Sequence, residues 1–107
     1  MASRKEYLSF VLEQLSDLEG ISYQAMMGEY ILYVHGKIIG GIYDDRLLVK
    51  PTPAAKKMMP DAPQERPYEG AKDMLLVENM DDRAFLTVLF NSMADELPAP
   101  KTKKGTN

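Results

Sequence analysis

The sequence predicts an α+β fold of two layers, in which helices pack on a mostly antiparallel sheet of four to five strands. A length of 107 residues is typical of a single domain. Apolar residues recur at helical spacing near both ends, and the region between them is rich in β-branched and aromatic residues separated by two-residue turn signals. The expected order is helix, four strands, helix, strand, helix, within a domain that spans residues 1–98.

Residues 4–18 are predicted to form the first helix. Ser3 and Glu6 stand in the spacing of a capping box, which favours a helix start at this point. Apolar residues then follow at intervals of three and four, as in a helix with one buried side: Leu8, Val11, Leu12, Leu15 and Leu18. Gly20 supplies the left-handed conformation in which many helices end.

Four strands are predicted next, at residues 22–26, 30–34, 37–43 and 46–50. The pairs His35-Gly36 and Asp44-Asp45 separate the last three of them. Two-residue connections produce antiparallel hairpins, and Gly, Asp and His tolerate the positive φ of such turns better than most residues do. Consecutive strands are therefore expected to be neighbours in the sheet.

The remaining elements are shorter or less regular. Thr52 before Pro53 predicts a capped helix that extends to about residue 59. Three prolines within residues 60–67 predict an irregular connection as far as Gly70, and residues 74–77 are predicted to return to the sheet as a strand. The last helix is expected to start among residues 79–82 and to end before Pro98.

The alternation of side chains assigns each strand residue to a face if Val34 lies opposite Lys37 and Tyr43 opposite Arg46. One face then carries no charge and is expected to receive the helices, with Gly40 allowing a helix to approach closely. Its members are Ile31, Tyr33, Ile38, Gly40, Ile42, Leu47 and Val49. The other face combines an apolar centre with tyrosine and basic residues at its margin. Its members, which we predict to form a protein interface, are Tyr30, Leu32, Val34, Lys37, Ile39, Tyr43, Arg46, Leu48 and Lys50, together with Gly41.

An apolar centre with a polar rim is typical of protein interfaces, so this second face is expected to bind a partner, most simply a second copy of the chain. Two alternatives remain. The C-terminal helix or the proline-rich connection could cover the face within one chain. Alternatively, the face could contact nucleic acid, with basic residues binding phosphates: Lys37, Arg46, Lys50, Lys101, Lys103 and Lys104.

Composition and motifs argue against an enzyme. The chain has no cysteine and one histidine, His35, which is predicted in a solvated turn. The pairs Asp44-Asp45 and Asp81-Asp82 could bind a metal ion, but a tight turn and a helix start use aspartate in other ways. A hydrolase or metal enzyme would require Asp44, Asp45, Glu29 and His35 to converge. No cofactor, metal or small-molecule substrate is therefore expected.

The charge distribution and the hydropathy of the chain predict a cytoplasmic protein. No run of eighteen apolar residues exists, so a membrane span is not expected. The net charge is −3, and three of the thirteen basic residues lie within residues 99–107, which are predicted to form a flexible basic tail. A net negative charge argues against general affinity for nucleic acid.

Several ordered blocks of this sequence resemble the TfoX N-terminal domain family, the front part of the TfoX/Sxy regulators of natural competence. The blocks are residues 26–30 (MMGEY), 35–37 (HGK), 45–52 (DRLLVKPT), 67–72 (PYEGAK) and 97–101 (LPAPK). The resemblance implies a sheet with flanking helices similar to secretion-chaperone-like domains, no catalytic residue, and a role in transcription or competence. Met27 stands where many members of the family carry phenylalanine, and the competence regulators contain a second, helical domain that this sequence does not include.

Overall fold

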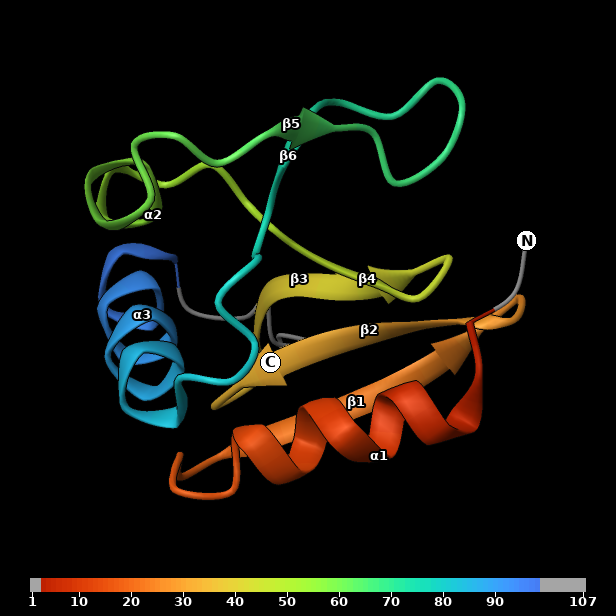
Figure 1. Cartoon of the computed structure of the whole chain (residues 1–107), viewed down its shortest axis with the longest axis horizontal. Coiled ribbons are helices and arrows are strands. Elements are labelled where there is room, and N and C mark those ends of the chain that lie inside the picture. Colours follow the sequence, from red (N-terminus) through yellow and green to blue (C-terminus); the bar gives the residue numbers. More distant parts are fainter. Residues whose placement is uncertain (1–2, 99–107) are drawn as a thin grey trace, which may run out of the picture.

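The sheet of this protein follows the chain for four strands and then departs from sequence order. The computed structural model describes residues 3–98, and Figure 1 shows the sheet with its helices. Six strands are arranged in the order β1-β2-β3-β4-β6-β5, and every neighbouring pair is antiparallel. The elements are α1 (Lys5–Gln14), β1 (Ile21–Met26), β2 (Glu29–Val34), β3 (Lys37–Tyr43), β4 (Arg46–Val49), α2 (Pro53–Met58), β5 (Gln64–Glu65), β6 (Met74–Leu76) and α3 (Arg83–Glu96).

The three helices and one face of the sheet share a single apolar core. In Figure 1, α1 lies alongside β1, and α3 stands at the end of the central strands next to α2. The helices contribute Leu8, Val11, Ala55, Leu86, Leu89, Phe90, Met93 and Ala94 to the core. The sheet contributes Leu32, Val34, Ile39, Ile42, Leu47, Val49 and Leu75. The predicted α+β class is thus confirmed, with six strands instead of four to five. The additional strand, β5, lies in the proline-rich connection.

Three tight turns join the first four strands. At each turn both connecting residues have positive φ: Met27 and Gly28, His35 and Gly36, and Asp44 and Asp45. Two positive φ values in succession define the type I′ turn, whose twist matches that of a hairpin. The turns at His35-Gly36 and Asp44-Asp45 confirm the prediction. The turn at Met27-Gly28 extends the same pattern to β1 and β2.

The predicted capping box is wrong, and α1 is shorter than expected. Arg4 is the N-cap residue and no side chain caps the helix. The Ser3 hydroxyl instead donates to the Glu29 carboxylate at 2.6 Å, across to the start of β2. The helix ends at Gln14, but Leu15 and Leu18 in the following turns are still buried in the core. The apolar spacing therefore continued past the end of the helix.

The caps predicted for the other two helices are present. The Thr52 hydroxyl accepts from the backbone N–H of Ala55 at 3.2 Å, with Pro53 in the first turn of α2. The Asp82 carboxylate accepts from the N–H of Phe85 at 3.0 Å at the start of α3. Each of these interactions satisfies an amide that a helix start leaves without an intrahelical partner.

A register shift between β2 and β3 decides which side chains meet the helices. Val34 lies opposite Lys37 and Tyr33 opposite Ile38, but Leu32 lies opposite Gly40 and Tyr30 opposite Ile42. Ile39 is thus an additional residue in β3, a β-bulge. Beyond it, Ile42 and its neighbours in β4 face the same side as Leu32 and Val34. The predicted faces depend on regular alternation along β3. They therefore match each face of β2 with the wrong face of the strands beyond the bulge.

The bulge also explains the two glycines of β3. A Cβ on Gly40 would lie 2.7 Å from the Cα of Val49. A Cβ on Gly41 would lie 2.6 Å from the carbonyl oxygen of Tyr30. Both contacts are to neighbouring strand backbones, which cannot move away cheaply. Gly40 therefore permits close approach of β4, and not of a helix as the sequence suggested.

Candidate functional site

The face of the sheet opposite the helices carries exposed apolar side chains, and we call it the open face. Its residues are Ser22, Gln24, Met26, Glu29, Ile31, Tyr33, Ile38, Gly41, Tyr43, Arg46, Leu48 and, directly after β4, Lys50. Ile38 is 42% exposed, although it lies within a central strand. Side chains of this kind normally avoid water, so the open face is the candidate functional site of the domain.

The structure divides the predicted interface residues between the two faces. Tyr43, Arg46, Leu48 and Lys50 lie on the open face, although Leu48 is fully buried there and Tyr43 is only 8% exposed. The other five, Tyr30, Leu32, Val34, Lys37 and Ile39, face the helices. Leu32, Val34 and Ile39 are fully buried. The prediction that these five lie on an exposed face is therefore wrong, because α1 and the C-terminal helix α3 of the same chain cover this side of the sheet.

Two hollows flank a pair of tyrosines on the open face. The first, of about 450 Å³, is lined by Met26, Met27, Glu29, Ile31, Tyr43 and Tyr68. The second, of about 410 Å³, lies toward β6, and its lining includes Ile38, Tyr43, Lys50, Pro67, Tyr68 and Met74. Tyr43 and Tyr68 border both, with ring centroids 6.2 Å apart and planes inclined at 59°. The two hollows thus form one apolar depression divided by an aromatic ridge.

Tyr43 is held in place by the strand beneath it. Its ring lies over Gly41, where an added Cβ would be 2.7 Å from a ring carbon. Burial raises the pKa of Tyr43 above its ordinary value, and the neighbouring Tyr68 contributes to the same direction. The phenol therefore stays neutral at physiological pH.

The predicted phosphate-binding residues are largely occupied within the chain. The Lys37 ammonium donates to the carbonyl of Ala94 at 2.7 Å, in the last turn of α3. Arg46 forms an ion pair with Glu65 of β5 and donates to the carbonyl of Tyr43 at 3.0 Å. Lys50 borders the second hollow. The other three candidates, Lys101, Lys103 and Lys104, lie outside the described residues.

The acidic residues at the turns hold the start of the chain. The Arg4 side chain and backbone N–H both bind the Asp45 carboxylate, at 2.9 and 2.8 Å. The backbone N–H of Arg4, followed by its guanidinium, holds the pKa of Asp45 below the ordinary value. Ser3 links Glu29 to the N–H of Asp45, at 2.6 and 3.0 Å. This network fastens α1 to two of the tight turns.

His35 lies far from this network, because it follows the other end of β2. Its ring occupies the space that a Cβ on Gly20 would need, and the backbone N–H of His35 donates to the Gly20 carbonyl at 2.9 Å. The convergence of Glu29, Asp44, Asp45 and His35 that a hydrolase would require is therefore not found. Within residues 3–98, no group of three or more potential metal ligands is present.

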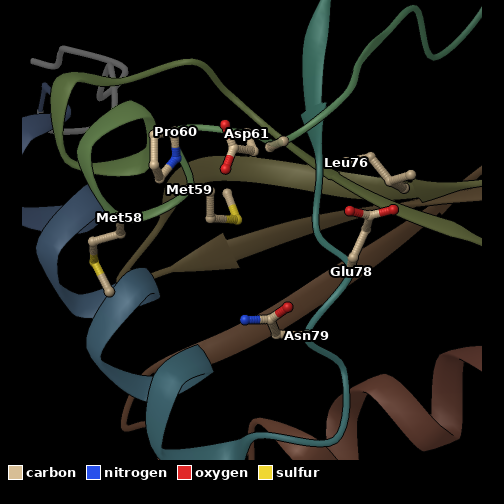
Figure 2. A pocket seen from close by; sticks show the side chains of 8 residues that line it. Met58, Met59, Pro60, Asp61, Leu76, Glu78 and Asn79 are labelled. Carbon is tan, nitrogen blue, oxygen red and sulfur yellow. The ribbon is translucent and has the colours of Figure 1, made fainter.

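A third hollow, of about 230 Å³, lies between the end of α2 and the segment after β6. Figure 2 shows its lining side chains, with Met58 and Met59 on one side and Glu78 and Asn79 on the other. The carboxylates of Asp61 and Glu78 come from different segments and do not point toward each other in this view. The hollow combines apolar and acidic groups without bringing a reactive pair together.

Sequence reasoning missed the exposed apolar residues that dominate the open face. Met27 is 96% exposed at the tip of its turn, and Tyr68 follows Pro67 in an irregular segment. The available signal was Met27 itself, since a large apolar residue before glycine at a turn position has little to pack against. Tyr68 gave no local signal, because its partner Tyr43 is distant in the sequence.

Comparisons with known proteins give one family and one close relative. The family model described as TfoX N-terminal domain matches residues 13–92. A protein of Spirochaeta aurantia, described as an uncharacterized 12.7 kDa protein in the trpE 5′ region, is 35% identical over 105 residues. The match covers 97% of this chain and 91% of that protein. No solved structure matches. Among the described residues, no helix has the length and apolar character needed to cross a membrane.

Proposed function

Because the chain belongs to the TfoX N-terminal domain family, we propose that it is a non-enzymatic protein-interaction domain that binds a protein partner on its open face. The process it serves is the regulation of transcription or competence, as the family suggests. The observation that carries the proposal is the apolar depression around Tyr43 and Tyr68, with Met26, Met27 and Ile38 exposed beside it.

The depression has the anatomy of an interface. Its floor is apolar, and charged groups stand at its margin: Glu29 beside the first hollow, and Lys50, Lys72 and Asp73 beside the second. Protein interfaces place most of their binding energy in such a centre, where aromatic residues and pockets meet, and surround it with a polar rim. Each hollow is large enough to receive apolar side chains of a partner.

The non-enzymatic part of the proposal rests on how the polar groups are used. Glu29 and Asp45 are bonded to Ser3 and Arg4, which fixes the start of the chain. The His35 ring packs on Gly20. The carboxylates of Glu29 and Asp45 and the ring of His35 are thus engaged in structural contacts.

Nucleic-acid binding is a weaker second candidate. Lys50 and Lys72 border the same hollow, and both could contact phosphates. Lys37 lies on the helix side, bonded to Ala94, and Arg46 is paired with Glu65, so few cations remain for phosphates on the open face. Phosphate contacts weaken steeply as salt rises, whereas an apolar contact does not. Binding measured at low and high salt therefore separates the two candidates.

The proposed site is tested by substitution of Ile38. The Ile38→Asp variant places a charge in the second hollow of the depression, while Val88→Asp places one at a comparably exposed apolar position on α3, where Val88 is 54% exposed. Both variants are expected to keep the circular dichroism spectrum of the wild type. Affinity capture from the native cell, followed by titration of each purified captured protein, measures binding.

We expect Ile38→Asp to weaken the binding of a specific partner by at least about tenfold, which corresponds to about 1.4 kcal/mol, and Val88→Asp to leave it unchanged. Equal binding by wild type and Ile38→Asp would contradict the proposed site. Binding that is lost at high salt, and recovered with a nucleic acid, would favour the second candidate.

A further inference from the structure

Strand β1 forms one edge of the sheet, and its outer backbone groups have no partner among the described residues. The N–H of His35 donates to the carbonyl of Gly20 at 2.9 Å, which shows that the even-numbered residues of this segment turn toward β2. Backbone groups alternate in direction along a strand. Ile21, Tyr23 and Ala25 therefore direct their N–H and C=O groups outward.

This edge lacks the features that normally protect an exposed strand. Sheet edges avoid unwanted pairing by charge, proline, bulges or very short length. The segment Ile21–Met26 contains no charged residue and no proline, and it pairs with β2 at all six positions without a shift. The opposite edge, β5, has two residues. Of the two sheet edges in residues 3–98, β1 is the one that presents a long and regular template for another strand.

We infer that a second copy of this chain pairs with β1 in antiparallel orientation, with a two-fold axis at Tyr23. In this register Tyr23 lies opposite Tyr23 of the other copy, and Ile21 lies opposite Ala25. All outward N–H and C=O groups of Ile21, Tyr23 and Ala25 then find partners. A shift of the axis to Ser22 or Gln24 would leave some of these groups without a partner inside β1.

The side chains match in this register as well as the backbone does. On the helix side, apolar Ile21 meets Ala25 and the two Tyr23 rings meet each other, which extends the edge-to-face contact of Tyr23 with Tyr30 at 5.9 Å. On the open face, Ser22 lies opposite Gln24. The Gln24 carbonyl oxygen already accepts from the Tyr33 hydroxyl at 3.0 Å, so its amide group is free to donate to Ser22. Cross-strand pairs of these kinds stabilise sheets.

A second copy suits this edge better than a charged peptide does. The strand carries no charge, so self-pairing brings no like charges into direct opposition. Residues 22–26 are exposed, and Tyr23 on the helix side is 48% exposed, so α1 leaves these side chains accessible to a second strand. A two-fold axis of this kind runs perpendicular to the sheet and leaves both open faces on the same side. The dimer therefore goes beyond the proposed function by presenting two partner sites together.

Charge substitution at Tyr23 tests both the dimer and its register. Because position 23 pairs with itself, Tyr23→Lys and Tyr23→Glu each place like charges opposite each other and are expected to run as monomers in light scattering. An equimolar mixture is expected to form dimers, with association at least about tenfold tighter than that of either variant alone. The exposed position of Val88 on α3 gives the matched controls, Val88→Lys and Val88→Glu, which should stay dimeric.

Three outcomes would overturn the inference. They are a wild-type protein that is monomeric at every concentration, dimers that persist in both Tyr23 variants, and a mixture that does not associate. Loss of the dimer in Ile38→Asp, with the Tyr23 variants unaffected, would place the second copy on the open face instead. Because oligomeric state is measured without any partner protein, failure of this inference leaves the proposed partner site to its own test.

Discussion

Ile38 and Ile39 are adjacent residues of the same type, and replacing each by alanine tests the assignment of the open face. Ile39 is fully buried in the core, whereas Ile38 is 42% exposed on the other side of the sheet. Removing a buried isoleucine side chain costs about 2 to 5 kcal/mol, because apolar contacts are lost and a cavity remains. We expect about 3 kcal/mol for Ile39→Ala.

The cost for Ile38→Ala is expected to be about 1 kcal/mol, since the lost groups are partly solvated already and no closed cavity forms. Urea unfolding followed by circular dichroism measures both free energies, and an unchanged slope shows that the unfolded states are comparable. Both variants keep the outward groups of β1, so their difference does not depend on dimerisation. Equal losses, or a greater loss for Ile38→Ala, would refute the bulge and the open face together.

Three further substitutions test contacts described above. Met27 has a φ of 52° and is 96% exposed. Asparagine tolerates this conformation better, so Met27→Asn should raise the free energy of unfolding by about 1 kcal/mol. A lower urea midpoint than that of the wild type would contradict this expectation. Lys37→Met removes the bond to the Ala94 carbonyl and should cost about 1 kcal/mol, so an unchanged midpoint would show that the contact adds nothing. The pKa of Asp45 is lowered by the backbone N–H and then the guanidinium of Arg4, so the folded state binds this proton less readily than the unfolded state does. Stability from Asp45 is therefore present above its ordinary pKa of 3.8 and is lost as pH falls below it toward the folded value. Asp45→Asn should flatten this acid limb in urea midpoints measured across pH, and identical profiles would contradict it.

The elements that could be predicted from sequence are those governed by neighbouring residues. His35-Gly36 and Asp44-Asp45 satisfy a conformational demand that few residues tolerate, so their turns were predictable. Thr52 before Pro53 determines its cap in the same local way. Ser3 shows the limit of such reasoning, because a distant carboxylate, Glu29, competed successfully for its hydroxyl.

The bulge at Ile39 accounts for most of the error in the site, and its sequence signal, the glycine pair that follows it, does not say where the additional residue lies. Ile38 and Ile39 are both apolar, so either could face the core, and the alternation of side chains cannot reveal an additional residue. The predicted faces group the right residues together within β2, and again within the part of β3 and β4 beyond the bulge. The error lies in which face of the first part is matched with which face of the second. Tyr43, Arg46, Leu48 and Lys50 were still placed on the open face, because they lie beyond the shift.

The other omissions arise from contacts between distant segments. Strand β5 has two residues, and it exists because β6 pairs with it at Gln64 and Glu65. Tyr68 belongs to the site through its contact with Tyr43. No pattern of spacing within the segment itself reports either contact. Both contacts can be identified only from the three-dimensional structure, in which β6 lies between β4 and β5.

The three two-residue turns have a consequence for the order in which the chain folds. Strands β1 to β4 meet through contacts between residues close in sequence, which form rapidly because little chain entropy is lost. Strand β6 reaches β4 only after the excursion through residues 50–73, a slower closure. We expect amides of β2 and β3 to gain protection first in pulse-labelling hydrogen exchange, and the amide of Val77, which donates to the carbonyl of Leu47 in β4 at 3.0 Å, to gain it last. Until then the newly made outer strand, β4, is a second unpaired edge, so nascent chains are most prone to mispairing in that interval.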